Sequence, residues 1–146
     1  MDNIEEKPMS ENDRKKEYLK TYRRMVLREK SLEEDIQELR ANEMFPGAVK
    51  YTDMPKGCNG NGDLSDYAVK ISEKIEELKE QYFLTIVKKM EIKEKIRRVN
   101  DAELQEILEL RYIHFYSWEK IATERGYTYR HVLRLHGEAL KKFKMS

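Results

Sequence analysis

Apolar residues recur every three or four positions along most of the chain, which is the period of an amphipathic α-helix. The first series starts after residue 10 and comprises Tyr18, Leu19, Tyr22, Met25, Val26, Leu32, Ile36 and Leu39. Ser10 stands three residues before Asp13, an acidic variant of the capping box that starts a helix. The sequence Phe45-Pro46-Gly47 is expected to end this helix, since proline opposes its continuation and glycine permits the exit.

A second series of apolar residues follows a stretch, 45–62, that is rich in proline and glycine and predicts a flexible loop. Asp63 is expected to cap a helix that runs to Arg98 and has the stripe Leu64, Ala68, Ile71, Ile75, Leu78, Tyr82, Ile86, Met90 and Ile96. This stripe can pack on the first helix as an antiparallel hairpin or on a second chain. We favour the hairpin, and we expect Ile71, Ile75, Leu78 and Tyr82 to support dimerisation as well. No apolar strand precedes the glycine-rich stretch and no Lys-Ser/Thr follows it, which disfavours a phosphate-binding loop.

Three shorter helices are predicted after residue 100. Asn100 with Glu103 is expected to start the first, whose apolar face is Leu104, Ile107, Leu108, Leu110 and Tyr112. Ser117 is expected to cap a helix over 118–125 that Gly126 closes, and Thr128 to cap a last helix that ends near Lys144. The fold class is therefore all-α: a helical hairpin or coiled coil over 10–98, then a three-helix module over 101–146.

The last two predicted helices have the spacing of a helix-turn-helix. A small residue, Ala122, stands where two helices must cross closely, and Gly126 follows four residues later at the turn. The apolar residues that would lock the second helix onto the first are Ile121, Tyr127, Val132 and Leu135. The alternative is an ordinary helical hairpin without a role in nucleic-acid binding.

The stretch LRYIHFYSWEKIATERGYTYRHVLRLHGEALKKF resembles region 4 of the sigma-70 family of RNA polymerase subunits. Leu110-Arg111-Tyr112, the run 118–122, Gly126 and the run 139–142 carry the likeness. The whole arrangement resembles phage and prophage regulators of late-gene transcription of the ArpU and RinA type. This resemblance implies a sequence-specific DNA-binding regulator that acts with host RNA polymerase. In place of the apolar pair that sigma region 4 has before the turn glycine, the chain has Glu124 and Arg125, and the stem of Arg125 could cover the core while its head reaches phosphate.

The start of the last helix supplies the candidate DNA contacts. If Val132, Leu135, Ala139 and Leu140 face the core, the residues towards the major groove are Tyr129, Arg130, Leu133 and Arg134. Arg130 and Arg134 can each grip a guanine edge, and Leu133 can meet a thymine methyl group. Thr128 and nearby amides are expected to hold a phosphate at the helix N-terminus. The remaining candidates, expected either to contact the DNA backbone or to be simply solvated charges, are His131, Lys141 and Lys142.

The distribution of charge supports a DNA-binding end more than the total does. The chain has a formal net charge of +1, but residues 125–146 contain six basic residues and one acidic residue, a net charge of +5. The remainder therefore carries −4. A basic end on an acidic body is typical of DNA-contacting domains, although lysines at a helix C-terminus are also favoured without any ligand.

Other function classes find little support in the sequence. The three histidines, His114, His131 and His136, have no cysteine nearby, and Cys58 is the only cysteine, so a metal site is disfavoured. We find no nucleophile with a base, no apolar run of membrane-spanning length and no signal peptide, and we expect a cytoplasmic, non-enzymatic protein without cofactors. The alternatives are a phage DNA-packaging recognition subunit and an interaction protein that docks on polymerase or a sigma factor.

Overall fold

The computed structural model describes residues 7–44 and 60–146, and every regular element among them is an α-helix. Six helices follow one another along these residues: α1 (Glu11–Leu19), α2 (Thr21–Met44), α3 (Gly60–Arg97), α4 (Ala102–Tyr112), α5 (Trp118–Arg125) and α6 (Tyr129–Lys142). The all-α prediction is confirmed. In the described part of the chain, no helix is both long and apolar enough to cross a membrane.

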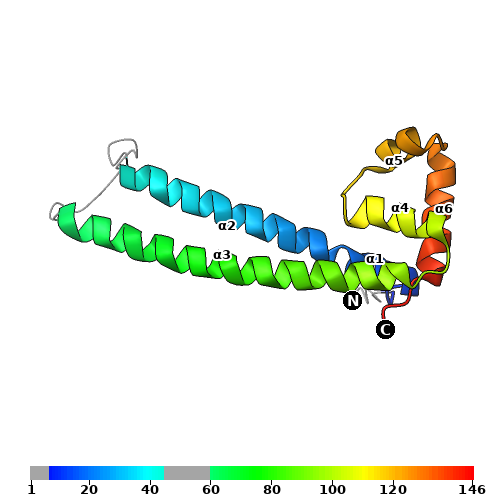
Figure 1. Cartoon of the computed structure of the whole chain (residues 1–146), viewed down its shortest axis with the longest axis horizontal. Helices are drawn as coiled ribbons and strands as arrows, with labels where there is room; N and C mark the ends of the chain where they lie inside the picture. The colour runs from blue at the N-terminus through cyan, green and yellow to red at the C-terminus, as the bar shows by residue number, and fades with distance from the viewer. Residues whose placement is uncertain (1–6, 45–59) are drawn as a thin grey trace, which may run out of the picture. The chain divides into compact units, whose positions relative to one another are not determined.

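The chain divides into two compact units. The first, called here the terminal unit, combines the residues up to Arg24 with Ile86–Ser146, and the second, the central unit, is Met25–Thr85. Within the central unit, α2 and α3 run side by side in opposite directions (Figure 1). Arg28 of α2 pairs with Glu77 of α3 at 3.1 Å.

The interior of the central unit is sparse and partly polar. Leu32 and Ile36 of α2 and Ile71 of α3 are buried there. Gln81 and Thr85 of α3 are also buried, and they bond to one another. The Thr85 hydroxyl donates to the backbone carbonyl of Gln81 at 2.7 Å, and the side-chain amide of Gln81 donates to the Thr85 hydroxyl at 3.4 Å. Two inward positions of α3 are therefore polar, a pattern that apolar periodicity cannot detect.

The predicted stripe of α3 is correct at some positions and wrong at others. Ile71 and Ile96 are buried, and Ile75 and Leu78 are half-buried. The exposed members are Leu64, Ala68, Tyr82, Ile86 and Met90. The reason is that Gln81, Thr85 and Ile92 occupy the inward positions, which turns the apolar residues at 82, 86 and 90 towards water. Ile71 is itself buried within the chain. In this structure it is therefore not open to a second chain, contrary to the expectation.

The terminal unit has a larger apolar core. Its largest side chains with less than 2% exposure come from five helices, the α3–α4 connection and the last segment: Leu19, Ile92, Ile96, Val99, Leu104, Ile107, Leu108, Ile121, Val132, Leu140 and Phe143. α6 packs against α1, α4 and α5. The two ends of the chain thus share one core, which sequence periodicity alone does not predict.

Some helix ends agree with the prediction, and others differ from it by one to several residues. Ser10 accepts a hydrogen bond from the Asp13 amide at 3.1 Å, as predicted, but the helix breaks at Lys20 instead of running on. α3 begins at Gly60, so Asp63 lies inside its first turn and does not cap it. α3 ends at Arg97 and α6 at Lys142, slightly before the predicted ends. The prediction for 45–62 falls on positions outside the described residues, except for 60–62, which are helical and not a loop.

Candidate nucleic-acid interface

Each of the three C-terminal helices starts at a side chain that caps its free amides. Asp101, not Asn100, caps α4: its carboxylate accepts from the amides of Glu103 and Leu104 at 3.0 and 3.2 Å. An aspartate also stabilises the positive end of the helix dipole. Ser117 accepts from Lys120 at 3.2 Å and Thr128 from His131 at 3.1 Å, so the predicted caps of α5 and α6 are confirmed.

The connection between α5 and α6 is a tight left-handed turn. Gly126 has φ +68°, a conformation that L side chains adopt only with strain. The Tyr127 amide then donates to the Ala122 carbonyl at 2.9 Å. A Cβ on Gly126 would meet no atom within 4 Å, so the backbone angle, and not lack of space, requires glycine here. Ala122 is 8% exposed, as expected of a small residue at a helix crossing.

α6 has two distinct faces. Val132, Leu135, Ala139 and Leu140 are buried, as predicted. The exposed face carries Tyr129, which is 46% exposed, and Leu133, which is 39% exposed, together with the exposed cations of Arg130 and Arg134. Thr128, Lys141 and Lys142 are also exposed, and His131 is half-buried. Seven of the eight candidate residues thus lie open to solvent on α6 or at its cap.

The cations of α6 are not neutralised within the described part of the chain. No carboxylate there lies within ion-pair distance of Arg130, Arg134, Lys141 or Lys142. Arg134 lies 3.0 Å from the Nδ1 atom of His131. Since a guanidinium can only donate, Nδ1 is the acceptor in this contact. These four cations are available to an anionic partner.

Arg125, in contrast, is exposed but has a carboxylate partner. Its guanidinium pairs with the Glu106 carboxylate of α4. The expectation that its head reaches phosphate did not include this carboxylate, which α4 places beside the guanidinium. The hydroxyl of the next aromatic residue, Tyr127, similarly donates to Glu103 of α4. The turn before α6 is thus tied to α4 by two polar contacts.

A buried polar cluster links the three helices behind the exposed face of α6. His136 is only 5% exposed, and its Nε2 atom lies 2.7 Å from the Tyr112 hydroxyl. Burial lowers the pKa of His136 to about 4 and raises the pKa of Tyr112 to about 12. The Trp118 ring packs on His136 with centroids 4.5 Å apart, and the Arg111 guanidinium lies 4.2 Å from the centre of the Trp118 ring. His136 is therefore neutral near pH 7 and packs in the core. Its helical spacing from the buried residues Val132 and Leu135 could have predicted this burial from the sequence.

The N-terminal helix α1 anchors the far end of α6. Lys15 is 6% exposed, and its ammonium group donates to the Leu140 carbonyl at 2.7 Å. This carbonyl is one of the last four of α6, which have no partner within the helix. The Tyr18 and Phe143 rings pack with centroids 6.1 Å apart. α1 thus stabilises the position of α6 without covering its N-terminal half.

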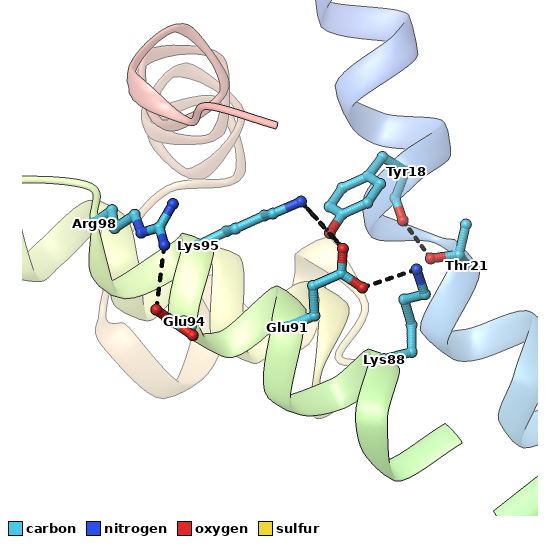
Figure 2. Close-up of polar contacts among 7 residues, drawn as sticks. All are labelled: Tyr18, Thr21, Lys88, Glu91, Glu94, Lys95 and Arg98. Carbon is cyan, nitrogen blue, oxygen red and sulfur yellow. Dashed lines mark hydrogen bonds and ion pairs between the residues drawn. The ribbon is translucent and has the colours of Figure 1, made fainter. Parts of the chain in front are cut away.

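The last turns of α3 hold α1 through a polar network (Figure 2). Tyr18 donates to Glu91 at 2.9 Å and accepts from Lys95 at 2.8 Å, while Lys88 pairs with Glu91 at 2.9 Å. The hydrogen bond from Lys88, followed by that from Tyr18, lowers the pKa of Glu91 to about 2. The Glu91 carboxylate is therefore ionised at neutral pH.

The loop between α4 and α5 contains a strained residue. Phe115 has φ +61°, the only positive φ of a non-glycine residue in the described part of the chain. Its ring stacks on Tyr22 at 5.4 Å, and the Arg23 guanidinium lies 5.8 Å from the centre of the Phe115 ring. These contacts hold the loop, and with it the start of α5, against the first turns of α2.

Other kinds of site receive no support from the described residues. They hold no cluster of three or more histidine, cysteine, aspartate or glutamate side chains that could bind a metal ion. His114 is exposed, with its ring 6.2 Å from that of Tyr116. Comparisons with protein-family models, with curated proteins and with solved structures each give no match to this chain.

Proposed function

We propose that α5, the Gly126 turn and α6 form a helix-turn-helix that binds double-stranded DNA in a sequence-specific way. The observation that supports this most is the exposed start of α6. Tyr129, Arg130, Leu133 and Arg134 lie open to solvent there, and the two arginines have no carboxylate partner among the described residues. Such a face offers both bidentate donors and an apolar contact to the base edges of a major groove.

The roles of these residues follow from their chemistry. Arg130 and Arg134 read guanine, and Leu133 meets a thymine methyl group. The Thr128 oxygen already accepts from the His131 amide, so its hydroxyl proton is free to donate to a phosphate. Lys141 and Lys142 lie about 16 and 18 Å from Arg130 along the helix and contact the DNA backbone only.

The biological role that we propose rests on the resemblance to sigma region 4 and to phage late-gene regulators. The chain would then regulate transcription, as a cytoplasmic, non-enzymatic protein that acts with host RNA polymerase. As alternatives, the same DNA-binding module could belong to a phage DNA-packaging subunit, or the chain could dock on polymerase without DNA. A ring-shaped oligomer would favour the first alternative, and co-purification with polymerase without DNA affinity would favour the second.

Selection of bound sequences from a random duplex pool by the purified full chain tests this proposal. We expect enrichment of a motif that contains guanines, and affinity for that motif above the affinity for a scrambled duplex. The Arg40→Ala variant removes an exposed cation of α2, outside α5 and α6, and is the control. It should retain both the enrichment and the higher affinity for the enriched motif. No enrichment by the wild-type chain would contradict sequence-specific binding.

A further inference from the structure

α3 carries a second apolar face that nothing in the described chain covers. Phe83 and Met90 are each 66% exposed, and Ile86 is 58% and Val87 47% exposed. Spacings of three, four and seven residues place these four side chains on one face of a helix. Leu84, at the edge of that face, is 51% exposed. All five belong to one uninterrupted helix, α3.

This face is separate from the one by which α3 packs within the chain. Gln81, Thr85 and Ile92 are the buried residues of the same turns, and they lie on the opposite side of the helix. Single exposed apolar residues are common on protein surfaces, but a contiguous apolar patch is typical of an interaction site. The charged residues of α3 on either side of the patch indicate what kind of partner fits it.

The charges of α3 are arranged asymmetrically about the patch. Before it, residues 73–80 contain four glutamates and two lysines, a net charge of −2. Ser72 and the four glutamates, Glu73, Glu76, Glu77 and Glu80, line a shallow acidic depression. From the end of the patch onward, residues 88–98, which include Met90, contain six basic and two acidic side chains, a net charge of +4. The helix is therefore acidic, then apolar, then basic.

We propose that this face of α3 binds the same face of a second copy of the chain in the antiparallel direction. A two-fold axis near the apolar patch brings the acidic segment of each helix onto the basic segment of the other, twice per dimer. The apolar patch, which lies between the charged segments, meets itself. A parallel pair would place acidic on acidic and basic on basic, which repel. A closed two-fold pair also satisfies both faces without forming a filament.

This surface differs from the one that the apolar periodicity predicts. Ile71, Ile75 and Leu78 are wholly or partly buried within the chain, whereas the proposed interface uses the residues that α3 leaves exposed. The dimer does not depend on DNA binding. If both proposals hold, each particle carries two reading helices and recognises two related half-sites.

Sedimentation of the full-length chain over a series of protein concentrations tests the interface. We expect a monomer–dimer equilibrium for the wild type, and a rise of at least about tenfold in the dimer dissociation constant for Phe83→Glu with Met90→Glu, because an apolar contact is replaced by four like charges. The control Leu27→Glu changes a residue of α2 that is 55% exposed and lies off the patch, and it should leave the equilibrium unchanged. Circular dichroism confirms that each variant remains helical.

Charge reversal tests the direction of pairing. Glu76→Lys with Glu80→Lys should weaken the dimer, as should Lys93→Glu with Arg97→Glu, and the four substitutions together should restore it. A monomeric wild type, a dimer indifferent to the Phe83 and Met90 changes, or no restoration in the fourfold variant would overturn the proposal. DNA binding at a single half-site by a monomeric variant would show that the DNA-binding proposal stands even where the dimer interface is lost.

Discussion

The two units of the chain achieve burial in different ways. The terminal unit encloses a core from five helices, and even its buried polar groups, Lys15 and His136, have partners in another helix. The central unit is a pair of helices with few buried apolar residues, and its buried Gln81 and Thr85 bond within α3. A two-helix layer buries only one stripe of each helix, so apolar residues elsewhere on α3 remain exposed. The terminal unit therefore fixes one arrangement of its helices, whereas the central unit buries fewer of its apolar residues. The exposed apolar face of α3 begins at Phe83 and Leu84 of the central unit and continues at Ile86, Val87 and Met90 of the terminal unit.

The largest expected effect breaks this comparison at the core. Leu108→Ala in α4 removes a side chain that is fully buried in the terminal unit and should lower the free energy of unfolding by about 2–5 kcal/mol. Leu78→Ala in α3 removes a half-buried side chain of the central unit and should cost about 1 kcal/mol. Denaturant unfolding, followed by hydrogen exchange resolved along the chain, measures both. Equal losses would show that the two units are packed alike.

The second prediction assigns DNA recognition to the terminal unit. Arg130→Ala or Arg134→Ala should cost roughly 1–3 kcal/mol on a selected duplex and little on a scrambled one. Lys141→Ala or Lys142→Ala should weaken both duplexes by a similar, smaller factor and reduce the salt dependence of binding, because each removes a phosphate contact. Titrations against the two duplexes at several salt concentrations separate these outcomes. Folded arginine variants that keep the full specificity ratio would contradict the assignment of the α6 face.

The third prediction uses pH to separate the units. Burial holds the pKa of His136 at about 4 against an ordinary 6.5, so the unfolded chain takes up a proton first as the pH falls. The stabilisation from neutral His136 is complete above pH 6.5 and is lost progressively towards pH 4. Between about pH 8 and about pH 5 the terminal unit should lose on the order of 2 kcal/mol. Glu91 does not interfere, since its depressed pKa makes it titrate below this range.

A variant without the titrating group is the control for this measurement. His136→Gln can still accept the Tyr112 hydroxyl and should lose most of the pH dependence between those two values. Hydrogen exchange in the central unit should change little over the same range. An undiminished pH dependence in the variant would show that another group is responsible.

Helix caps and turns, which depend on neighbours along the chain, could be predicted from the sequence. The burial of polar residues, which depends on distant partners, could not. The caps Ser10, Ser117 and Thr128 and the turn at Gly126 need only a few adjacent residues, and all four predictions are confirmed. Lys15 and His136 are buried because helices far apart in the sequence supply a carbonyl and a hydroxyl. No local pattern contains these partners.

The candidate DNA-binding face shows the same division. The faces of α6 follow from helical periodicity, and their predicted burial and exposure agree with the structure. The ion pair of Arg125 could not be predicted, because its partner, Glu106, lies on another helix. In α3, the error came from the assumption that inward positions are apolar, which Gln81 and Thr85 violate.

The smallest expected effect concerns those two polar residues and would sharpen the comparison between the units. Replacing Gln81 by Leu and Thr85 by Val together removes a buried polar pair whose members satisfy each other, so no partner is left without a hydrogen bond. Such paired replacements are close to neutral or stabilising, and we expect the central unit to gain up to about 1 kcal/mol. The single change Gln81→Leu leaves the Thr85 hydroxyl its bond to the backbone carbonyl of residue 81 and should be nearly neutral. Hydrogen exchange of α2 and α3 is the measurement, with α4 to α6 as the internal reference. A loss of protection in the double variant would mean that the polar pair determines how α2 and α3 pack, and that the central unit is as specifically packed as the terminal one.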